Sequence, residues 1–250
     1  MEKLMEQYRF FLKDKVRQMI DFSLTDQSRG IPVPPVEKPF APDDLLIDLV
    51  AKDSWRSISA IDLLSAIQNR KSHRHFSAAP VTLEELSFLL WATQGVRERA
   101  GEFTFFRTVP SAGCRHALET YLCALNVTGL ETGIYRYLPL EHQLLTVAKD
   151  RDLPQKIVAA TFGQSFTGKA PVTFIWTTIP YRMEWRYHIA AHKVIALDAG
   201  HVCQNLYLAS AAIGGGVCAI AAYHQELMDE LLNVDGENEF TLYLAAVGKI

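Results

Sequence analysis

The stretch RKSHRHF, residues 70–76, places three basic side chains, a hydroxyl and two imidazoles within seven positions. It follows an apolar pattern with helical spacing over residues 58–69, so a helix is expected to end here. In an extended segment alternate side chains share one side. Arg70, Ser72 and Arg74 are therefore expected to converge, whereas Lys71 and His73 point elsewhere.

Two interpretations of this stretch are open on local grounds. A guanidinium group offers forked, permanently charged donors and serine adds a neutral donor, so the segment suits a phosphate group. Basic clusters at helix ends are also commonly solvated surfaces or partners for the last helical carbonyl groups. The spacing of the residues does not decide between these two interpretations.

The composition is that of a folded protein with a sizeable core. Of the 250 residues, 49% are hydrophobic and 21% are charged, which argues against disorder. The formal net charge of -3 argues against a nucleic-acid-binding protein, which normally carries a basic excess. Any anion site must therefore depend on a local cluster such as residues 70–76.

The sequence predicts a cytoplasmic protein without a membrane segment. Its first residues, MEKLMEQYRFFLKDKVRQ, contain no apolar run of signal-peptide length. Residues 206–223 are nearly all apolar, but three glycines at 214–216 divide them into pieces too short to span a bilayer. Widely separated cysteines without a C-x-x-C pair indicate reduced structural thiols and no metal site. These cysteines are Cys114, Cys123, Cys203 and Cys218.

Two regions are predicted from the amino terminus onward. Residues 1–57 form an arm, in which a helix over 1–22 with an apolar stripe precedes an extended segment that carries five of the eleven prolines. Residues 58–250 form the main domain. Its first helices cover 58–69 and the segment after Pro80, where Thr82 and Glu85 form a capping box and Gly95 ends the helix. Residues 96–103 are expected to form a polar loop.

The remaining elements predict an α+β fold. Strands are expected at 119–127, 133–138, 143–148, 170–177, 218–222 and 240–247. Helices are expected at 152–162 and 224–232, and a single long helix at 184–212. The strands in the middle read as hairpins, and there is no regular alternation of strand and helix. No dinucleotide-binding fingerprint or P-loop is present, which excludes these nucleotide sites.

Residues for acid–base or nucleophilic catalysis are few. The sequence has no G-x-S-x-G elbow and no evident carboxylate pair, and two short His motifs, His73-x-His75 and His201-x-Cys203, are weak signals for a metal. Chemistry that needs few protein acids and bases often belongs to a cofactor.

Several motifs occur in a characteristic order. They are Arg70-x-Ser72-x-Arg74-x-Phe76, Gln94-Gly95, Arg107-x-x-Pro110-Ser111-Ala112-Gly113, Gly133-Ile134-Tyr135-Arg136-Tyr137, Ala199-Gly200-His201-Val202-x-Gln204-Asn205-Leu206 and Tyr243-Leu244-Ala245-Ala246-Val247-Gly248-Lys249. The first three resemble the nitroreductase-like flavoprotein family, and the later ones resemble its SagB-type dehydrogenase branch. The resemblance covers about residues 58–250 and leaves the amino-terminal arm outside.

The resemblance implies a three-layer sandwich in which helices flank a central, mainly antiparallel sheet. It also implies an intertwined homodimer with one FMN at each of two interface sites. By position, Arg70, Ser72 and Arg74 would hold the phosphate and ribityl end of FMN. The other subunit would supply the turn that approaches the flavin. That turn consists of Pro110, Ser111, Ala112 and Gly113.

Further positions follow from the same resemblance. The backbone of Ala219, Ile220, Ala221 and Ala222 would face the isoalloxazine ring, with an amide near Ala221 reaching N5. Two more side chains would contact the cofactor. Gln164 would contact the ring or ribityl chain, and Lys249 the phosphate.

Two positions depart from the azoline-oxidising members of the branch. Those proteins carry a Lys-Tyr pair upstream of the Gly-His motif, where this chain has Arg186-Tyr187. Arginine stays protonated and cannot act as a base, so of the two candidate catalytic residues Tyr187 is the acid or base. Ala221 stands where relatives tend to carry glycine, which narrows the space over the flavin.

The resemblance yields three functional hypotheses. The first is an FMN-dependent oxidoreductase that exchanges hydride between flavin N5 and a small conjugated molecule, such as a nitroaromatic or a quinone, with NAD(P)H as diffusible donor. The second is a peptide thiazoline or oxazoline dehydrogenase of the SagB type. The third is a flavin- or partner-binding module without catalysis.

Overall fold

The computed structural model describes residues 2–250, and a seven-stranded sheet forms its centre. The strand order is β1-β6-β5-β4-β7-β9-β8, and every neighbouring pair is antiparallel. The strands are β1 (Leu46–Asp48), β4 (Leu118–Ala124), β5 (Gly133–Leu138), β6 (Gln143–Lys149), β7 (Val172–Thr178), β8 (Gly215–Ile220) and β9 (Phe240–Lys249). A separate hairpin consists of β2 (Val96–Arg99) and β3 (Phe105–Arg107).

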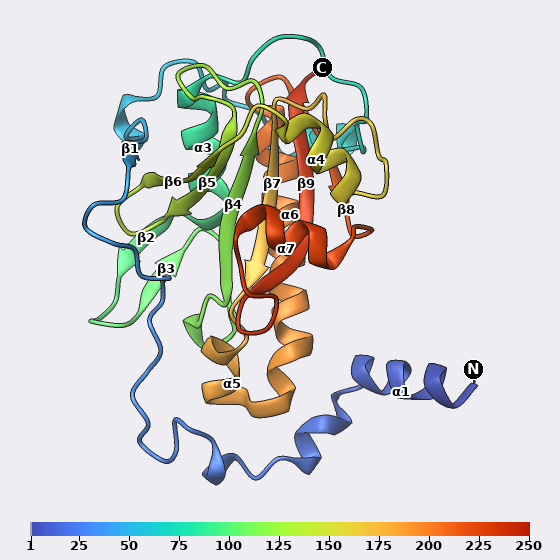
Figure 1. Ribbon diagram of the computed structural model, residues 1–250. Helices are drawn as coiled ribbons and strands as arrows, with labels where there is room; N and C mark the ends of the chain where they lie inside the picture. Colours follow the sequence, from blue (N-terminus) through green and yellow to red (C-terminus); the bar gives the residue numbers. More distant parts are fainter. Residues whose placement is uncertain (1) are drawn as a thin grey trace.

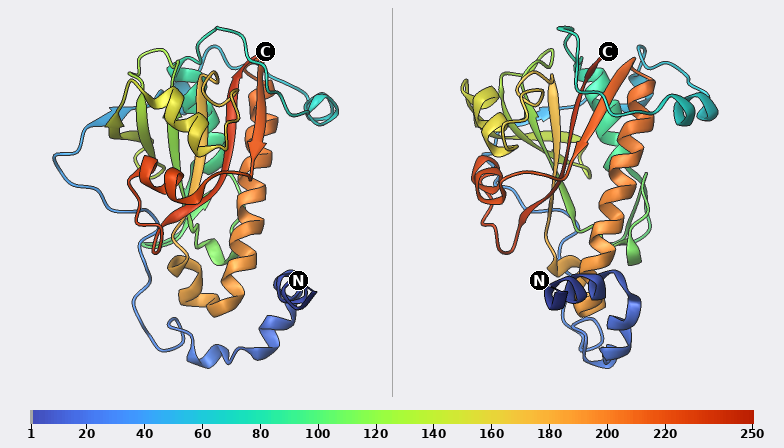
Figure 2. Two further views of the ribbon diagram at one scale, coloured as in Figure 1. Left: turned by 45° about the vertical axis from the view of Figure 1, so that its right-hand side comes forward. Right: turned by 90° about the vertical axis from the view of Figure 1, so that its right-hand side faces the viewer.

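Helices cover both faces of the sheet (Figure 1; Figure 2). They are α1 (Glu2–Leu12), α2 (Leu63–Asn69), α3 (Leu83–Gln94), α4 (Leu153–Ala160), α5 (Tyr181–Tyr187), α6 (Ala191–Ala211) and α7 (Gln225–Leu232). Short 3-10 helices are η1 (Asp14–Met19), η2 (Phe22–Leu24), η3 (Lys52–Ser54), η4 (Ala112–Cys114) and η5 (His188–Ala190). Helices α3 and α6 pack on one face, and α4 and α7 pack on the other.

The alternation of side chains along each strand explains the three layers. In β7, Phe174 and Trp176 join the core under α3 and α6, whereas Ile175 joins the core under α4 and α7. In β4, Leu122 and Cys123 divide in the same way. Because both faces are covered, every residue of these two strands is buried, and most of them are apolar. The predicted α+β fold with a central antiparallel sheet flanked by helices is confirmed.

Local signals predicted several elements well. The capping box is present, since the Thr82 hydroxyl accepts from the Glu85 amide while the Glu85 carboxylate accepts from the Thr82 amide. The strands predicted at 133–138 and 143–148 and the helix at 224–232 match β5, β6 and α7 to within about one residue. All four cysteines are free, in agreement with the expected thiols.

The predicted continuous helix over 184–212 is wrong. The chain forms α5, breaks at η5 and starts again as α6. At the break His188 has φ 49° and ψ -140°, a conformation outside the helical region. No glycine or proline marks this position, so helix-forming residues on both sides concealed the break. The break turns α5 away from the axis of α6 (Figure 1).

Other boundaries also differ from prediction. The helix expected over 1–22 ends at Leu12, and the helix expected over 58–69 starts only at Leu63, after the Asp62 side chain caps it. Residues 96–103, expected as a loop, contain β2 of the β2–β3 hairpin. The strand expected at 218–222 begins earlier, since the glycines at 215 and 216 belong to β8. No helix within residues 2–250 is long and apolar enough to cross a bilayer.

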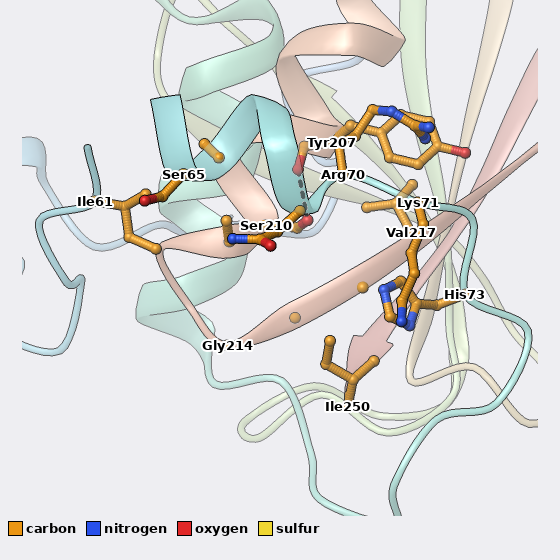
Figure 3. A pocket seen from close by; sticks show the side chains of 15 residues that line it. Ile61, Ser65, Arg70, Lys71, His73, Tyr207, Ser210, Gly214, Val217 and Ile250 are labelled. Carbon is orange, nitrogen blue, oxygen red and sulfur yellow. Dashed lines mark hydrogen bonds between the residues drawn. The ribbon is translucent and has the colours of Figure 1, made fainter. Parts of the chain in front are cut away.

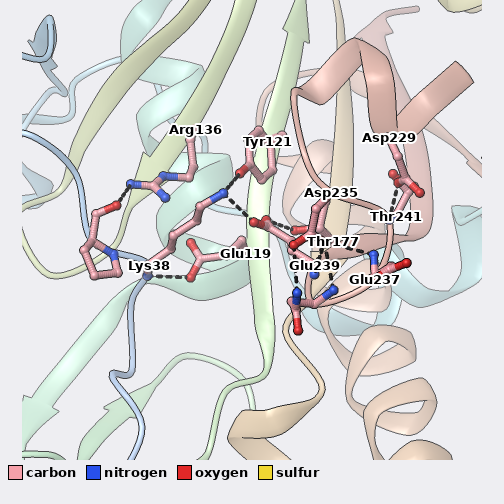
Figure 4. A network of polar contacts seen from close by, with 12 residues as sticks. Lys38, Glu119, Tyr121, Arg136, Thr177, Asp229, Asp235, Glu237, Glu239 and Thr241 are labelled. Carbon is pink, nitrogen blue, oxygen red and sulfur yellow. Dashed lines mark hydrogen bonds and ion pairs between the residues drawn. The ribbon is translucent and has the colours of Figure 1, made fainter. Parts of the chain in front are cut away.

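The proline-rich arm is tied to the sheet by a buried polar network (Figure 4). The amide of Lys38 donates to Glu119 Oε1 at 2.9 Å, and its ammonium lies 2.5 Å from Glu239 Oε2. Arg182, which is buried like Glu119, donates to the same Glu119 oxygen at 2.5 Å. Arg107 donates to the carbonyl of Val36 at 3.0 Å. The arm therefore supplies hydrogen-bond and charge partners for charged groups that are buried in the domain. The side chains of α1, by contrast, are exposed.

Glu37 adds a pH-sensitive contact to this network. Its carboxylate accepts from the Leu140 amide at 3.2 Å. Burial, together with the nearby Glu141 carboxylate, raises the pKa of Glu37 from 4.5 to about 8. The folded chain therefore holds a proton here that the unfolded chain loses above about pH 4.5. The stability that depends on this group is full at lower pH and is lost as the pH rises through 8.

The replacement Glu37→Gln should flatten this pH dependence. Relative to the unaltered protein, the free energy of unfolding of the variant should increase between about pH 5 and pH 9, by an amount on the order of a few kcal/mol. Urea denaturation at both pH values measures the difference. Glu131→Gln, at an exposed position, is the control. An equal difference at the two pH values would show that Glu37 does not titrate in this range.

Candidate functional site

The basic segment runs extended along the edge of the sheet beside β8. Residues 71–77 follow α2, and the amide of His73 donates to the carbonyl of Val217 at 2.9 Å. Farther along, the amide of Ser77 donates to the carbonyl of Lys249 at 2.9 Å. The extended course expected from the sequence is therefore observed.

Tyr207 of α6 connects the first residues of this segment to β8. The Arg70 guanidinium lies 5.1 Å from the centre of the Tyr207 ring. The Tyr207 hydroxyl oxygen is 3.0 Å from Ser72 Oγ and accepts from the amide of Ala219 at 2.9 Å. Arg70 and Ser72 thus meet on one aromatic side chain, as their alternate positions predicted.

The Tyr207 hydroxyl can free the proton of Ser72 for a ligand. The amide of Ala219 can only donate, so it occupies a lone pair of the Tyr207 oxygen. The phenol oxygen keeps a second lone pair, so either hydroxyl can donate in its contact with Ser72, and Ser72 Oγ is the acceptor when the phenol donates. This arrangement leaves the proton of Ser72 available for an anion beside Arg70. Hydrogen bonds in such a chain polarise one another, which makes Ser72 a better donor.

A cavity of about 220 Å³ lies next to this cluster (Figure 3). Arg70, Lys71, His73 and Tyr207 line it, and no aspartate or glutamate side chain does so. The expectation that Lys71 and His73 point away from Arg70 is therefore wrong, and Ser72 and Arg74 are not among the residues that line the cavity. Burial, aided by the charge of Lys71, lowers the pKa of His73, so its imidazole stays neutral near pH 7. Among the described residues, no carboxylate forms a salt bridge with Arg70, Lys71 or Arg74. The cluster carries uncompensated positive charge and suits an anion.

Two other expected phosphate ligands have different surroundings. Burial raises the pKa of the Cys218 thiol, and the charge of Arg74 opposes that shift, so Arg74 lies close to β8. The ammonium of Lys249 forms an ion pair with Glu85 and donates to the carbonyl of Ile213 at 2.5 Å. Lys249 therefore ties β9 to α3 and is already neutralised by a carboxylate.

The turn at 110–113 meets Arg186 and Tyr187 within one chain. Gly113 has φ 58°, and a side chain there would place Cβ only 2.6 Å from the Tyr187 hydroxyl and 3.0 Å from Arg186 Cδ and Nε. The positive φ favours glycine here, and a larger residue would also displace the ends of the Tyr187 and Arg186 side chains. Pro110 and Gly113 are exposed. The sequence named both groups of residues but did not predict their contact.

Asp198 of α6 faces the same turn. Burial raises the pKa of Asp198, whereas the Ser111 hydroxyl, the charge of His201 and the Ala112 amide act in the opposite direction. Asp198 is 7% exposed, and its Oδ2 has no hydrogen-bond partner among the described residues. Asp198 is therefore buried beside the turn.

The end of β8 forms a third group. Ala219 pairs with β9, and Ile220 is buried in the core beneath α4 and α7. Ala221 and Ala222 follow the strand and are exposed. The side-chain amide of Gln164 donates to the carbonyl of Ala222 at 3.0 Å. Gln164 thus fixes the backbone immediately beyond the strand.

Helix α6 separates the first two groups. Tyr207 marks the group at 70–74, and Asp198 marks the turn at 110–113. The two residues are nine positions apart on one helix, which corresponds to about 13.5 Å along its axis. Within one chain the structure therefore does not bring these groups together.

Tyr207 was missed by sequence reasoning. On α6 it occupies a position that reads as part of the apolar pattern of a buried helix. The one signal was its hydroxyl, since the polar end of a half-buried tyrosine normally finds a partner. Which partner it finds depends on the chain folding back to bring Ser72 beside β8.

Tyr207→Phe tests whether the Tyr207 hydroxyl strengthens anion binding through its hydrogen bond with Ser72. The variant keeps the ring under Arg70 but loses the hydroxyl, so affinity for inorganic phosphate should fall by roughly threefold to tenfold. Ser72→Ala should have a similar effect, and the double variant should lose no more than Ser72→Ala alone. Isothermal calorimetry measures the affinities. Tyr135→Phe, which removes a hydroxyl bonded to the Glu131 carbonyl far from the cavity, is the matched control. If the losses of phosphate affinity in the two single variants add up in the double variant, the two hydroxyls act independently and the proposed coupling is wrong.

Comparison with known proteins gives consistent matches. The model of the nitroreductase family matches residues 67–249. A candidate nitroreductase of Methanocaldococcus jannaschii is 32% identical over 192 residues, covering 77% of this chain and 93% of the relative.

Two solved structures share the fold. A nitroreductase-like protein from Ralstonia eutropha JMP134 superposes with a TM-score of 0.68 at 26% identity, covering 87% of this chain and 98% of the other. A chain of the E. coli microcin synthetase McbBCD complex, solved with truncated pro-MccB17, superposes with a TM-score of 0.62 at 20% identity. This match covers 81% of this chain and 78% of that one.

Proposed function

The chain belongs to the nitroreductase family, and we propose that it is an FMN-dependent oxidoreductase acting on small conjugated molecules. Nitroaromatics and quinones are the substrate class, and NAD(P)H is the electron donor. When bound, FMN supplies reversible two-electron chemistry through its ring. The residues of this chain bind the cofactor, orient it and exclude water from it.

The observation that carries this proposal is the acid-free basic cavity beside β8. Of the three expected ligands, Arg70 lines this cavity, and Ser72 and Arg74 stand beside it in the same extended segment. Together they would hold the FMN phosphate, with Tyr207 orienting Arg70 and Ser72 from α6. A phosphate fits this donor set because guanidinium groups bind it in a forked geometry and serine adds a neutral donor. The ion pair of Lys249 with Glu85 favours a supporting role for Lys249 behind the cavity.

The backbone after β8 is suited to the flavin ring. Ala219 to Ala222 lie at the sheet edge, and the exposed backbone at Ala221 can approach a flat ligand. Gln164 holds the Ala222 carbonyl and would keep this backbone in place.

A homodimer would complete the site. About 13.5 Å along α6 separates the turn at 110–113 from residues 70–74, which would bind the phosphate. A second subunit would therefore supply the turn. Apolar side chains on α2 support this assembly. Leu63, Leu64 and Ile67 are 55–66% exposed although α2 packs beside the cavity. Burial of such a patch normally requires a partner.

A second candidate function is the oxidation of thiazolines or oxazolines in a peptide. The likeness to a chain of the microcin synthetase complex favours it, as does the position of Tyr187 against the 110–113 turn. Tyr187 would be the acid or base, because Arg186 remains protonated. Formation of the azole from a peptide azoline, lost in Tyr187→Phe with unchanged flavin content, would favour this function over the first.

Arg70→Ala tests the phosphate contact. Loss of a hydrogen bond to a charged group costs about 1.5–3 kcal/mol, so FMN should bind roughly tenfold to hundredfold more weakly. Quenching of flavin fluorescence measures the affinity. Arg151→Ala, at an exposed position outside the cavity, is the control. Unchanged affinity for FMN in Arg70→Ala would contradict the phosphate contact of Arg70. If the unaltered protein is colourless and yields no flavin on extraction, the proposed function is wrong and the non-catalytic hypothesis is favoured.

A further inference from the structure

A second basic cluster lies at the 110–113 turn. Arg115 is 6% exposed and directs Nε to the carbonyl of Gly113 at 3.2 Å and a terminal nitrogen to the carbonyl of Phe103 at 3.3 Å. Arg186 packs against the same glycine and is only half-buried. Two guanidinium groups therefore share one turn, and one of them can be reached from solvent.

These two groups lack a counterion. Within residues 2–250, neither Arg115 nor Arg186 forms a salt bridge with a carboxylate. Burial lowers the pKa of Arg115, and the charge of Arg186 lowers it further, so the two charges lie close enough to repel. The groups that oppose this shift are weak acids, Cys114 and Tyr187. Like charges placed together without an acid form a favourable site for an anion.

The carboxyl group on the turn does not neutralise them. Asp198 faces Ser111, Ala112 and His201, and burial disfavours its charged form. In the part of the chain that the structure describes, Asp198 forms no salt bridge with Arg115 or Arg186. The positive potential at the turn is therefore not cancelled from α6.

Aromatic faces hold the guanidinium groups in position. Arg115 lies 5.5 Å from the ring of Trp185, and Arg186 lies 5.5 Å from the ring of Tyr187. Arg17 of the amino-terminal arm approaches the Tyr187 ring as well, at 6.0 Å, but it is paired with Asp14. Contact through the face of Arg186 leaves the N–H groups along its edge free to bind an anion, whereas Arg115 already donates to the carbonyls of Gly113 and Phe103.

We propose that Arg186, with Arg115 behind it and the Tyr187 hydroxyl beside it, binds a carboxylate or phosphate group on the molecule that reacts at the flavin. This inference rests on the proposed function, in which the 110–113 turn approaches the ring. The anion would come from the oxidising substrate or from the phosphates of the nicotinamide donor. Arginine in place of lysine thereby becomes an anchor that cannot lose its proton.

Matched substrates test the carboxylate source. Kinetics with 4-nitrobenzoate and 4-nitrobenzamide, which differ in charge, give a ratio of kcat/KM values. Arg186→Gln should lower that ratio roughly tenfold to hundredfold, because a charge-assisted contact is lost. Arg186→Lys should retain part of it, and Arg151→Gln should leave it unchanged. If Arg186→Gln has the same ratio of kcat/KM for 4-nitrobenzoate to kcat/KM for 4-nitrobenzamide as the unaltered protein, Arg186 does not bind the carboxylate.

The phosphate source has its own test. If the donor occupies the site, Arg186→Gln should raise KM for NADPH and NADH roughly tenfold or more while the nitrobenzoate ratio stays constant. If neither quantity changes, the anchor does not exist.

Binding without turnover separates this inference from the proposed function. Benzoate and inorganic phosphate are titrated into the purified protein by calorimetry, with flavin content measured by absorbance. Protein that lacks flavin but binds benzoate through Arg186 would overturn the function and retain the anion site. Protein with flavin in which Arg186→Gln binds both anions as tightly as before would overturn the site alone.

Discussion

The close approach of residues 71–77 to the sheet edge is the constraint on which the candidate site depends. Two glycines permit it. A Cβ on Gly216 would lie 2.6 Å from His73 Cγ, and a Cβ on Gly248 would lie 2.9 Å from the ring of Phe76. Any larger side chain would push the basic segment off β8 and would separate Ser72 from Tyr207. The absence of side chains at two strand positions thus fixes where the cations stand.

Helix α6 fixes the distance between this basic segment and the 110–113 turn. One end carries Tyr207 under Arg70, and Asp198, nine residues earlier, lies beside the 110–113 turn. A straight helix packed against the sheet keeps a constant separation between the two groups. The break at His188 matters for the same reason, because it directs α5, with Arg186 and Tyr187, back onto Gly113.

Sequence reasoning succeeded where the signal was local. The capping box at Thr82, the apolar strands and the extended course of the basic segment each follow from neighbouring residues. It failed where distant contacts decide the outcome. His188 adopts a positive φ without glycine, and the β2–β3 hairpin forms in a polar segment. The role of Tyr207 could not be predicted because its partners, Ser72 and Ala219, are far away in the sequence.

Both basic clusters share one electrostatic design. In each, a guanidinium group lies over an aromatic ring rather than against a carboxylate, as Arg70 does over Tyr207 and Arg186 over Tyr187. By contrast, the buried Arg182 of α5 is neutralised by Glu119 of β4. A carboxylate would fix an arginine as firmly but would cancel its charge, whereas an aromatic face fixes it and leaves the charge for an anion. The chain therefore reserves positive charge at two places although its net charge is -3.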